Sequence, residues 1–328
     1  MEDEIAAGGV THSRGPRPAA YLWLLILVPL LAYLAVFAIV RVPAFNYERW
    51  GTSRYGSVLE YAFHADHQDA DIVILGDSSA FIGIDPRLVN AQLGVKSILL
   101  PNTVGTLPLT GEISLERYLA RNKPPRLIVL YLTAWDLNYE HTPNPFLFDG
   151  DEMMLRHGTA RELGAAVKQY PVDFLVFPFR LSSTIGARKL LRILSGPDRV
   201  EQVTKALGHA DYPEGTVPMK GTCTIPAHYL WDEGDSTVSR LINKFTNSQT
   251  QVILYLSPVP DCTNASALSR AAYAQLGAAP PATLPVTMFV SDEGYAHLEP
   301  SGVPAATQLF IDAVRHRATP LLSSGSSH

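Results

Sequence analysis

Hydrophobic residues are distributed along the chain in two different patterns. Residues Ala19–Val40 form one apolar run that contains no charged side chain. A run of about 20 apolar residues is long enough to cross a bilayer, and membrane helices tolerate an internal proline such as Pro29. We therefore expect a transmembrane helix at residues 19–41, followed by one large domain at 42–320 and flanked by disordered tails at 1–18 and 321–328.

A cleavable signal peptide is the alternative interpretation of this run. The apolar core of a signal peptide normally covers only about 7–15 residues, and Val42-Pro43-Ala44 makes a poor cleavage site. These features favour an uncleaved anchor. Basic residues lie both before the run, at Arg17, and after it, at Arg41, so charge bias does not set the orientation.

Beyond residue 70 the hydrophobic pattern changes to short runs separated by polar segments. Strand-like runs recur at Ile72–Leu75, Ser97–Leu100, Leu127–Leu132, Val252–Leu256 and Val286–Val290. Helical patterns lie at Pro86–Leu93, Gly111–Ala120, Ser236–Asn247, Ala265–Leu276 and Pro304–Arg317. Strands that alternate with helices predict βαβ units and a parallel sheet. We expect an α/β fold, a three-layer sandwich around a five-stranded parallel sheet.

A long insertion separates the third and fourth predicted strands, at about residues 139–235. It is too long for an ordinary connection, and its pattern predicts helices at Asp151–Gln169 and Phe174–Leu194. The second of these is basic and amphipathic. Such a segment either lies on the membrane or against an integral partner, or packs as a lid on its own domain.

Charge and cysteine content narrow the class of protein. The net charge is −5 with 26 Lys and Arg residues, so the chain lacks the basic excess of a nucleic-acid-binding protein. Cys223 and Cys262 are the only cysteines and lie in loop-like sequence. They either form a disulfide, as is common in exported domains, or remain two thiols. Together with the anchor, the pair favours a single-pass protein of the cytoplasmic (inner) membrane with its domain outside.

The first predicted strand ends in Gly76-Asp77-Ser78-Ser79, which carries the strongest chemical signal. Ser78 arrives at the carboxyl end of a buried strand, where open α/β sheets bind their ligands. A serine hydroxyl needs a base to become a nucleophile. His297 is the best candidate, because it lies between the last predicted strand and the last helix and so returns to the same sheet edge.

The remaining site candidates also lie in turns or loops that follow predicted strands. Asp292 or Glu293, in the loop before His297, are candidates to orient the imidazole ring. After the other strands come polar or glycine-containing turns that can stabilise an oxyanion or bind substrate, although ordinary turns use the same residue types. Those candidates are Gly105, Asn102, Asp77, Asp136 and Asn138.

A cluster of histidines and carboxylates, His64 to Asp71, precedes the first strand. Such a cluster has the residue types of a metal site. It lies at the entry to the strand, however, and a solvated polar loop has the same composition. We therefore expect no metal and no cofactor.

These motifs together resemble those of the SGNH (GDSL-like) hydrolase superfamily. The resemblance rests on Gly76-Asp77-Ser78-Ser79, the glycine turn at Gly105, the turn at Asp136 and the segment from His297 to Gly302. It implies that Ser78 is the nucleophile, that His297 is the base and that Gly105 is the glycine of the second block. An anchor before such a domain resembles the branch that includes alginate acetylation proteins and the D-alanyl-transfer protein of teichoic acid synthesis.

Two positions depart from the family pattern. Trp135 stands where the third block usually has Asn, and Gly294 stands where the acid usually precedes the base. Either Asp292 or Glu293 substitutes for that acid, or the site works as a dyad, or it is inactive.

The resemblance implies an extracytoplasmic serine O-acyltransferase or esterase. Its expected substrates are acyl (acetyl) esters of cell-envelope polysaccharide or an acyl donor, and its expected partner is a multi-spanning membrane O-acyltransferase. The alternative is a non-catalytic accessory protein that binds glycan or scaffolds such an acyltransferase.

Overall fold

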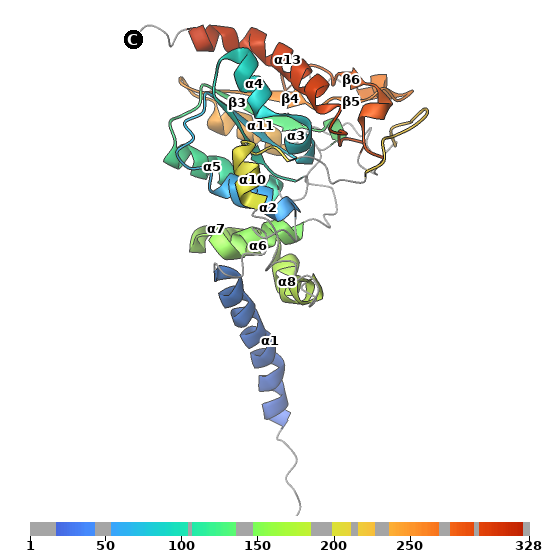
Figure 1. Cartoon of the computed structure of the whole chain (residues 1–328). Helices are drawn as coiled ribbons and strands as arrows, with labels where there is room; N and C mark the ends of the chain where they lie inside the picture. Colours follow the sequence, from blue (N-terminus) through green and yellow to red (C-terminus); the bar gives the residue numbers. More distant parts are fainter. Residues whose placement is uncertain are drawn as a thin grey trace, which may run out of the picture.

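The core of the protein is a parallel β-sheet with the strand order β2-β1-β3-β4 (Figure 1). The strands are β1 (Ile72–Gly76), β2 (Ser97–Pro101), β3 (Leu127–Leu132) and β4 (Gln251–Leu256). Their side chains are almost all buried, as the continuous apolar runs predict for a sheet that is covered on both faces. The computed structural model describes residues 18–42, 54–103, 107–135, 147–184, 199–210, 216–226, 236–268, 276–291 and 295–323.

Helices cover both faces of this sheet. On the face away from the apolar amino-terminal helix, α3 and α4 pack with α13 (Figure 1). On the other face, α2 packs with α5 and α10, and α11 lies beside α5, where Arg240 and Lys244 pair with Glu112. The bounds are α2 (Arg54–Phe63), α3 (Ser78–Gly83), α4 (Pro86–Leu93), α5 (Glu112–Arg121), α10 (Arg199–Lys205), α11 (Ser236–Phe245) and α13 (Val303–Ser323).

The expected fifth strand at Val286–Val290 is wrong, because the sheet has four strands among the described residues. Val286–Met288 forms a single 3₁₀ turn that begins after Pro285, and the Met288 N–H bonds back to the Pro285 carbonyl. Only isolated antiparallel bridges follow, from Phe289 to Leu298 and from Val290 to Pro218. A short parallel pair, β5 (Val259–Pro260) with β6 (Thr283–Leu284), forms a separate small sheet.

The insertion is helical in its described residues up to Lys205, as predicted, whereas residues 216–226 contain no helix. It contains α6 (Leu147–His157), α7 (Ala160–Gln169) and α8 (Pro171–Thr184). The single helix expected over Asp151–Gln169 is interrupted at Thr159, whose side chain accepts from the Glu162 N–H while Glu162 bonds back to the Thr159 N–H. This capping box starts a new helix. The second expected helix begins earlier, at Pro171, and residues 185–198 lie outside the described part.

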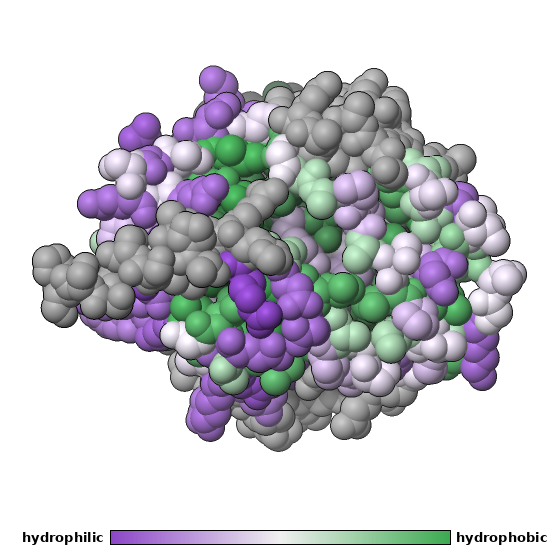
Figure 2. Space-filling model, turned by 90° about the horizontal axis from the view of Figure 1, so that it is seen from above, coloured by the Kyte–Doolittle hydropathy of each residue, from purple (hydrophilic) through white to green (hydrophobic). Residues whose placement is uncertain are grey.

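The amino-terminal helix α1 (Pro18–Arg41) projects away from the domain (Figure 1). Its segment Tyr21–Arg41 has a mean hydropathy of 2.7 and is almost entirely exposed, so α1 is long and apolar enough to cross a membrane. Figure 2 looks at the molecule from the opposite end, where the described residues form a mosaic of hydrophilic and hydrophobic side chains. Most of the exposed large hydrophobic side chains of the described residues belong to α1.

The last turns of α1 pack into a second hydrophobic cluster, which we call the junction cluster. Arg41 donates to the Leu155 carbonyl in the last turn of α6 and to the Gly158 carbonyl directly after it. Carbonyls in the last turn of a helix have no partner within that helix. The cluster thereby connects α1 to α2, α6 and α8. Its buried members are Val40, Leu59, Phe63, Leu109, Met153, Met154, Leu155, Ala166, Phe174 and Phe177.

Cys223 and Cys262 form a disulfide, which confirms the first of the two interpretations of the cysteine pair. Their Cα atoms lie 4.6 Å apart. The bond ties the end of the insertion to the loop after β5, where the Thr263 N–H also donates to the Cys223 carbonyl. In a chain-entropy treatment, a crosslink over 39 residues stabilises the folded state by about 4 kcal/mol.

Gly76, the last residue of β1, lies in a space that admits no side chain. A Cβ atom there would lie 2.3 Å from the Tyr131 carbonyl oxygen and 2.4 Å from the Ala80 Cβ. We therefore expect Gly76→Ala to lower the free energy of unfolding by about 3 kcal/mol. Chemical denaturation of the full chain in detergent micelles measures this loss.

Gly164→Ala is the matched control for this substitution. Gly164 is exposed within α7, and nothing lies within 4 Å of a Cβ at that position. Alanine should therefore raise the unfolding free energy, by up to about 1 kcal/mol, through helix propensity alone. Equal effects of the two substitutions would contradict the close packing of β1 on β3.

Candidate active site

A row of buried polar side chains follows the four strands at their carboxyl ends. β1, β2 and β3 are followed directly by Asp77, Asn102 and Thr133, and β4 is followed by Ser257. Each of these side chains is at most 1% exposed. Because the four strands are parallel and run in register, their polar ends meet along one edge of the sheet, where open α/β folds place their sites.

The Asp77 carboxylate connects the turn after β1 to the end of β3. Its Oδ1 accepts from the Ser79 N–H at 2.8 Å and from the Ser79 hydroxyl at 2.6 Å. Its Oδ2 accepts from the Thr133 N–H at 2.9 Å and from the Thr133 hydroxyl at 3.3 Å. Asp77 is completely buried, so it positions the turn that carries Ser78 and is closed to substrate.

Ser78 and His297 lie in hydrogen-bond contact at this edge. Ser78 is the first residue of α3 and is half-buried, and its Oγ lies 2.8 Å from the Nε2 of His297. The two residues are 219 positions apart in the sequence. The structure therefore brings together the serine and the histidine that the sequence analysis proposed as nucleophile and base.

His297 is held in place by backbone contacts on both sides of its loop. The Val290 N–H donates to the His297 carbonyl at 2.9 Å, and the next residue, Leu298, is bridged to Phe289. Both Phe289 and Leu298 are buried in a small apolar cluster under the start of α13. Two residues before the histidine, Tyr295 has a left-handed φ of 51°, a conformation that is uncommon outside turns and functional sites.

This arrangement supports proton transfer from serine to histidine. When Nε2 carries no proton, the Ser78 hydroxyl donates to it, which is the contact that activates a serine nucleophile. Both side chains are half-buried, so the pair remains accessible from solvent. The contact has the geometry expected of a nucleophile and its general base.

The other predicted site residues are described only in part. Asn102 is fully buried. Its side-chain oxygen accepts from the Thr110 hydroxyl at 2.7 Å, and its side-chain nitrogen lies 3.4 Å from the Leu100 backbone carbonyl. These contacts keep its side chain in the interior of the domain, next to the carboxyl-end edge of the sheet. The remaining candidates, which lie outside the described residues, are Gly105, Asp136, Asn138, Asp292 and Glu293.

Three residues near this edge were not singled out from the sequence. Thr133 and Ser257 belong to the polar row, and the same strand-end rule that pointed to Asp77 would have found them. Tyr131 lies below the row, opposite Gly76 in the register and stacked on Tyr255. Complete burial, with Tyr255 and Asp77 nearby, raises the pKa of Tyr131 well above its usual range, so its phenol stays neutral.

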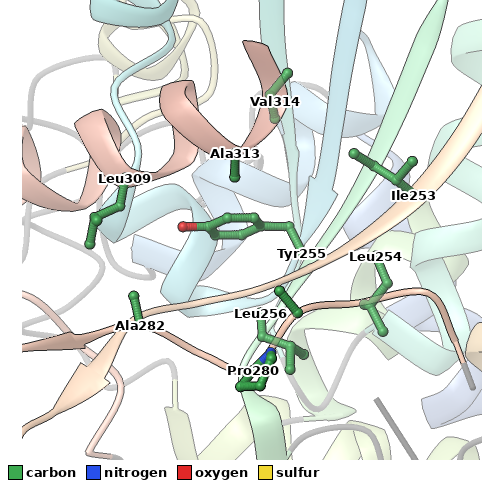
Figure 3. Close-up of a pocket in the computed structure, with 10 residues that line it drawn as sticks. Ile253, Leu254, Tyr255, Leu256, Pro280, Ala282, Leu309, Ala313 and Val314 are labelled. Carbon is green, nitrogen blue, oxygen red and sulfur yellow. The ribbon is translucent and has the colours of Figure 1, made fainter. Parts of the chain in front are cut away.

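A pocket of about 310 Å³ lies at the free side of β4 (Figure 3). The side chains drawn in Figure 3 come from β4, from the segment around Pro280 and from α13, and the ring of Tyr255 points toward α13. Apart from the Tyr255 hydroxyl, the lining side chains are apolar, and neither Ser78 nor His297 is among them. This pocket is therefore separate from the Ser78–His297 contact.

The carboxylates of the cluster before β1 are engaged in structural contacts. Asp66 pairs with Arg121 at 2.9 Å, and Asp71 pairs with Arg126 at 2.7 Å. Asp69 accepts from the Lys123 N–H at 2.8 Å. These contacts join the start of β1 to the segment before β3.

Comparison with protein-family models, curated proteins and solved structures finds no match for this chain. The functional conclusion therefore depends on the site itself. Its distinguishing features are the Ser78–His297 contact and the buried Asp77 that fixes the adjacent turn.

Asp77→Ala should destabilise the protein more than the loss of an ordinary helix cap does. The substitution leaves the buried N–H groups of Ser79 and Thr133 without their acceptor, and a buried donor without a partner costs about 1–3 kcal/mol. We therefore expect Asp77→Ala to lower the unfolding free energy by about 2–5 kcal/mol in chemical denaturation.

Asp85→Ala is the matched control. Asp85 also caps a helix, because its carboxylate accepts from the Arg87 N–H at the start of α4 and pairs with the exposed Arg87 side chain. Its loss should cost about 1 kcal/mol. A cost for Asp77→Ala no larger than this would mean that the bridge to β3 contributes little.

Proposed function

We propose that the protein is a serine esterase or O-acyltransferase in which Ser78 is the nucleophile and His297 is the general base. The observation that carries this proposal is the 2.8 Å contact between Ser78 Oγ and His297 Nε2. Residues so distant in sequence come into such contact at the ligand-binding edge of a parallel sheet, which is where α/β enzymes place their catalytic groups.

The reaction follows from this contact. Ser78 Oγ attacks the carbonyl carbon of an acyl ester while its proton passes to His297 Nε2. The tetrahedral intermediate then expels the alcohol, which takes the proton from His297 and leaves an acyl group on Ser78. Water or a sugar hydroxyl next attacks the acyl-serine with His297 as base, which gives hydrolysis in the first case and transfer in the second.

The arrangement supports assignment to an SGNH-like class. The nucleophile follows the first strand, the base precedes the last helix, and polar residues follow every strand of the four-stranded sheet. Asp292 or Glu293 is assigned to orient the imidazole, and Gly105 to hold the oxyanion. With Trp135 and Gly294 at two family positions, the Ser78–His297 pair provides the main catalytic contribution.

The proposed substrates are acyl (acetyl) esters of cell-envelope polysaccharide. The apolar α1 supports a position of the domain beside a membrane, and the Cys223–Cys262 disulfide suits an oxidising compartment. Both features support an orientation with the domain outside the cytoplasmic membrane. A multi-spanning O-acyltransferase in the same membrane is the proposed source of acyl groups.

Ser78→Ala and His297→Ala should each reduce acyl-ester turnover by about 10³-fold or more, because members of a catalytic unit fail together. Turnover of a chromogenic acetyl ester and labelling with a fluorophosphonate probe measure the loss on the full chain in detergent. Ser79→Ala is the matched control, because the Ser79 hydroxyl is buried and donates to Asp77. This variant should keep its probe labelling.

The outcome in cells separates the enzyme from an accessory protein. Cells that contain only the Ser78→Ala protein should lose acetyl esters from the envelope glycan. Wild-type levels of these esters, with the variant protein present at its normal abundance, would overturn the catalytic role and leave a glycan-binding or scaffolding role.

The membrane placement also assigns a role to α8. The 21 residues of Tyr21–Arg41 span about 31 Å as a helix, which matches the hydrocarbon thickness of about 30 Å. The last turns of this span pack on α6 and α8 (Figure 1). On α8, Val172 and Leu175 are 66% and 68% exposed beside this junction. Helix α8 therefore lies in the outer interface of the bilayer.

A cysteine that replaces Leu175 should report this environment. The native cysteines are joined in a disulfide, so the new thiol alone reacts with a polarity-sensitive fluorophore. In lipid nanodiscs we expect a blue-shifted emission and quenching by brominated lipids. Leu88→Cys on α4, on the far side of the domain from α1 (Figure 1), is the control. Equal quenching at both positions would contradict the placement of α8.

A further inference from the structure

Two histidines and a glutamate meet where α2 packs on α6. Glu60 and His64 lie one turn apart near the end of α2, and His157 is the last residue of α6. The Nε2 of His157 lies 2.8 Å from one Glu60 carboxylate oxygen, and the Nδ1 of His64 lies 3.7 Å from the other. The three ligand atoms all lie within 4.8 Å of one another.

We propose that Glu60, His64 and His157 bind a divalent metal ion of the zinc class. Zinc binds imidazole nitrogens and carboxylate oxygens at about 2.0–2.2 Å in a tetrahedral arrangement, so its ligand atoms are separated by about 3.4 Å. The 2.8 Å and 3.7 Å separations reach different oxygens of Glu60, and one ligand atom from each of the three residues lies within 4.8 Å of the other two. The Nδ1 of His64 also lies 2.9 Å from the Glu60 backbone carbonyl, so a rotation of the His64 side chain away from this carbonyl brings the three ligands to one ion.

The donor set selects the class of metal. Two imidazoles with one carboxylate suit zinc, cobalt, nickel or copper, whereas magnesium and calcium prefer oxygen ligands. Glu60 is buried, while the His64 side chain is 43% exposed. The exposed side gives an ion a route into the site and leaves room for a water molecule as the fourth ligand.

Contacts behind the ligands hold the site in position. The His157 carbonyl accepts from Arg117 at 2.9 Å, and Arg117 in turn pairs with Glu162. The rings of His64 and His157 meet edge to face with their centroids 4.5 Å apart. Such outer contacts orient metal ligands and contribute to affinity.

The charges around the site are compatible with a cation. Arg156 is adjacent to His157 in the chain, but its guanidinium pairs with the buried Glu152 at 2.6 Å. Arg117 is paired with Glu162. Both arginines thus donate to carboxylates other than Glu60.

The metal would act as a structural clamp, separate from the Ser78 site. His64 precedes β1 and Ser78 follows it, so the two sites are at opposite edges of the sheet. Glu60 and His64 belong to the α/β domain, whereas His157 belongs to the insertion that packs on α1. A bound ion would therefore join the domain to the helices that contact the anchor.

Cobalt binding to the full chain tests this proposal. The protein, without an affinity tag, is stripped with a chelator in detergent micelles and titrated with Co²⁺. We expect one equivalent to give the intense visible bands of tetrahedral coordination, and Zn²⁺, but not Mg²⁺, to remove them. His64→Asn should weaken binding by at least about tenfold.

His67→Asn is the matched control, because His67 is exposed, lies three residues away and has a left-handed φ of 55° that Asn adopts readily. This variant should bind Co²⁺ like the wild type. Zn²⁺ should also raise the thermal midpoint of the wild type and of His67→Asn, but not that of His64→Asn.

Three results would overturn the proposal. The first is a wild-type spectrum identical to that of Co²⁺ in buffer. The second is tetrahedral binding that His64→Asn leaves unchanged, and the third is an equal loss of binding in the His64 and His67 variants. His157→Gln provides an independent check, since it removes a ligand from the other helix and should abolish the same bands.

Discussion

The rest of the site depends on the buried carboxylate of Asp77, which joins the turn that carries Ser78 to the sheet. It accepts four hydrogen bonds, two from Ser79 and two from Thr133, so it fixes the turn after β1 against the end of β3. Gly76 makes this closeness feasible, because any side chain there would collide with the Tyr131 carbonyl. Ser78 lies in the turn that the Asp77 hydrogen bonds and the close packing at Gly76 hold in place. Its position is therefore set by backbone packing, while its hydroxyl remains directed at His297.

A second hydrophobic cluster gives the protein its elongated organisation. The helices of the insertion lie between the α/β domain and α1, and the junction cluster unites residues from all three parts (Figure 1). Arg41 adds hydrogen bonds to a carbonyl in the last turn of α6 and to one directly after it. The insertion thus serves as a packed spacer, which sets the distance between α1 and the sheet edge that carries Ser78.

The sequence predicts an element well where its signals are local. Helix α4 matches the expected Pro86–Leu93 because Asp85 caps it, Pro86 starts it and Gly94 ends it in a left-handed conformation. The expected strand at Val286–Val290 fails because Pro285 begins a 3₁₀ turn and the following residues bridge to Leu298 and Pro218. Apolar character alone does not distinguish these two outcomes.

Topology, more than composition, determined which site contacts could be predicted. Ser78 lies at the expected sheet edge because it follows β1. His297 meets it there although the strand expected before His297 is absent, because the Phe289–Leu298 bridge holds its loop in place. The approach of His157 to Glu60 depends on how α6 packs on α2, for which the sequence holds no local signal.

The separation of Ser78 from His297 in the sequence has a consequence for the order of events during synthesis. The serine is completed early in translation, whereas His297 lies in the loop before the final helix, 219 residues later. Contacts of such long range form late in folding, after their loop-closure cost has been met. The contact between Ser78 and His297 therefore forms only after α13 has docked, so this sheet edge is completed only when the whole domain has folded.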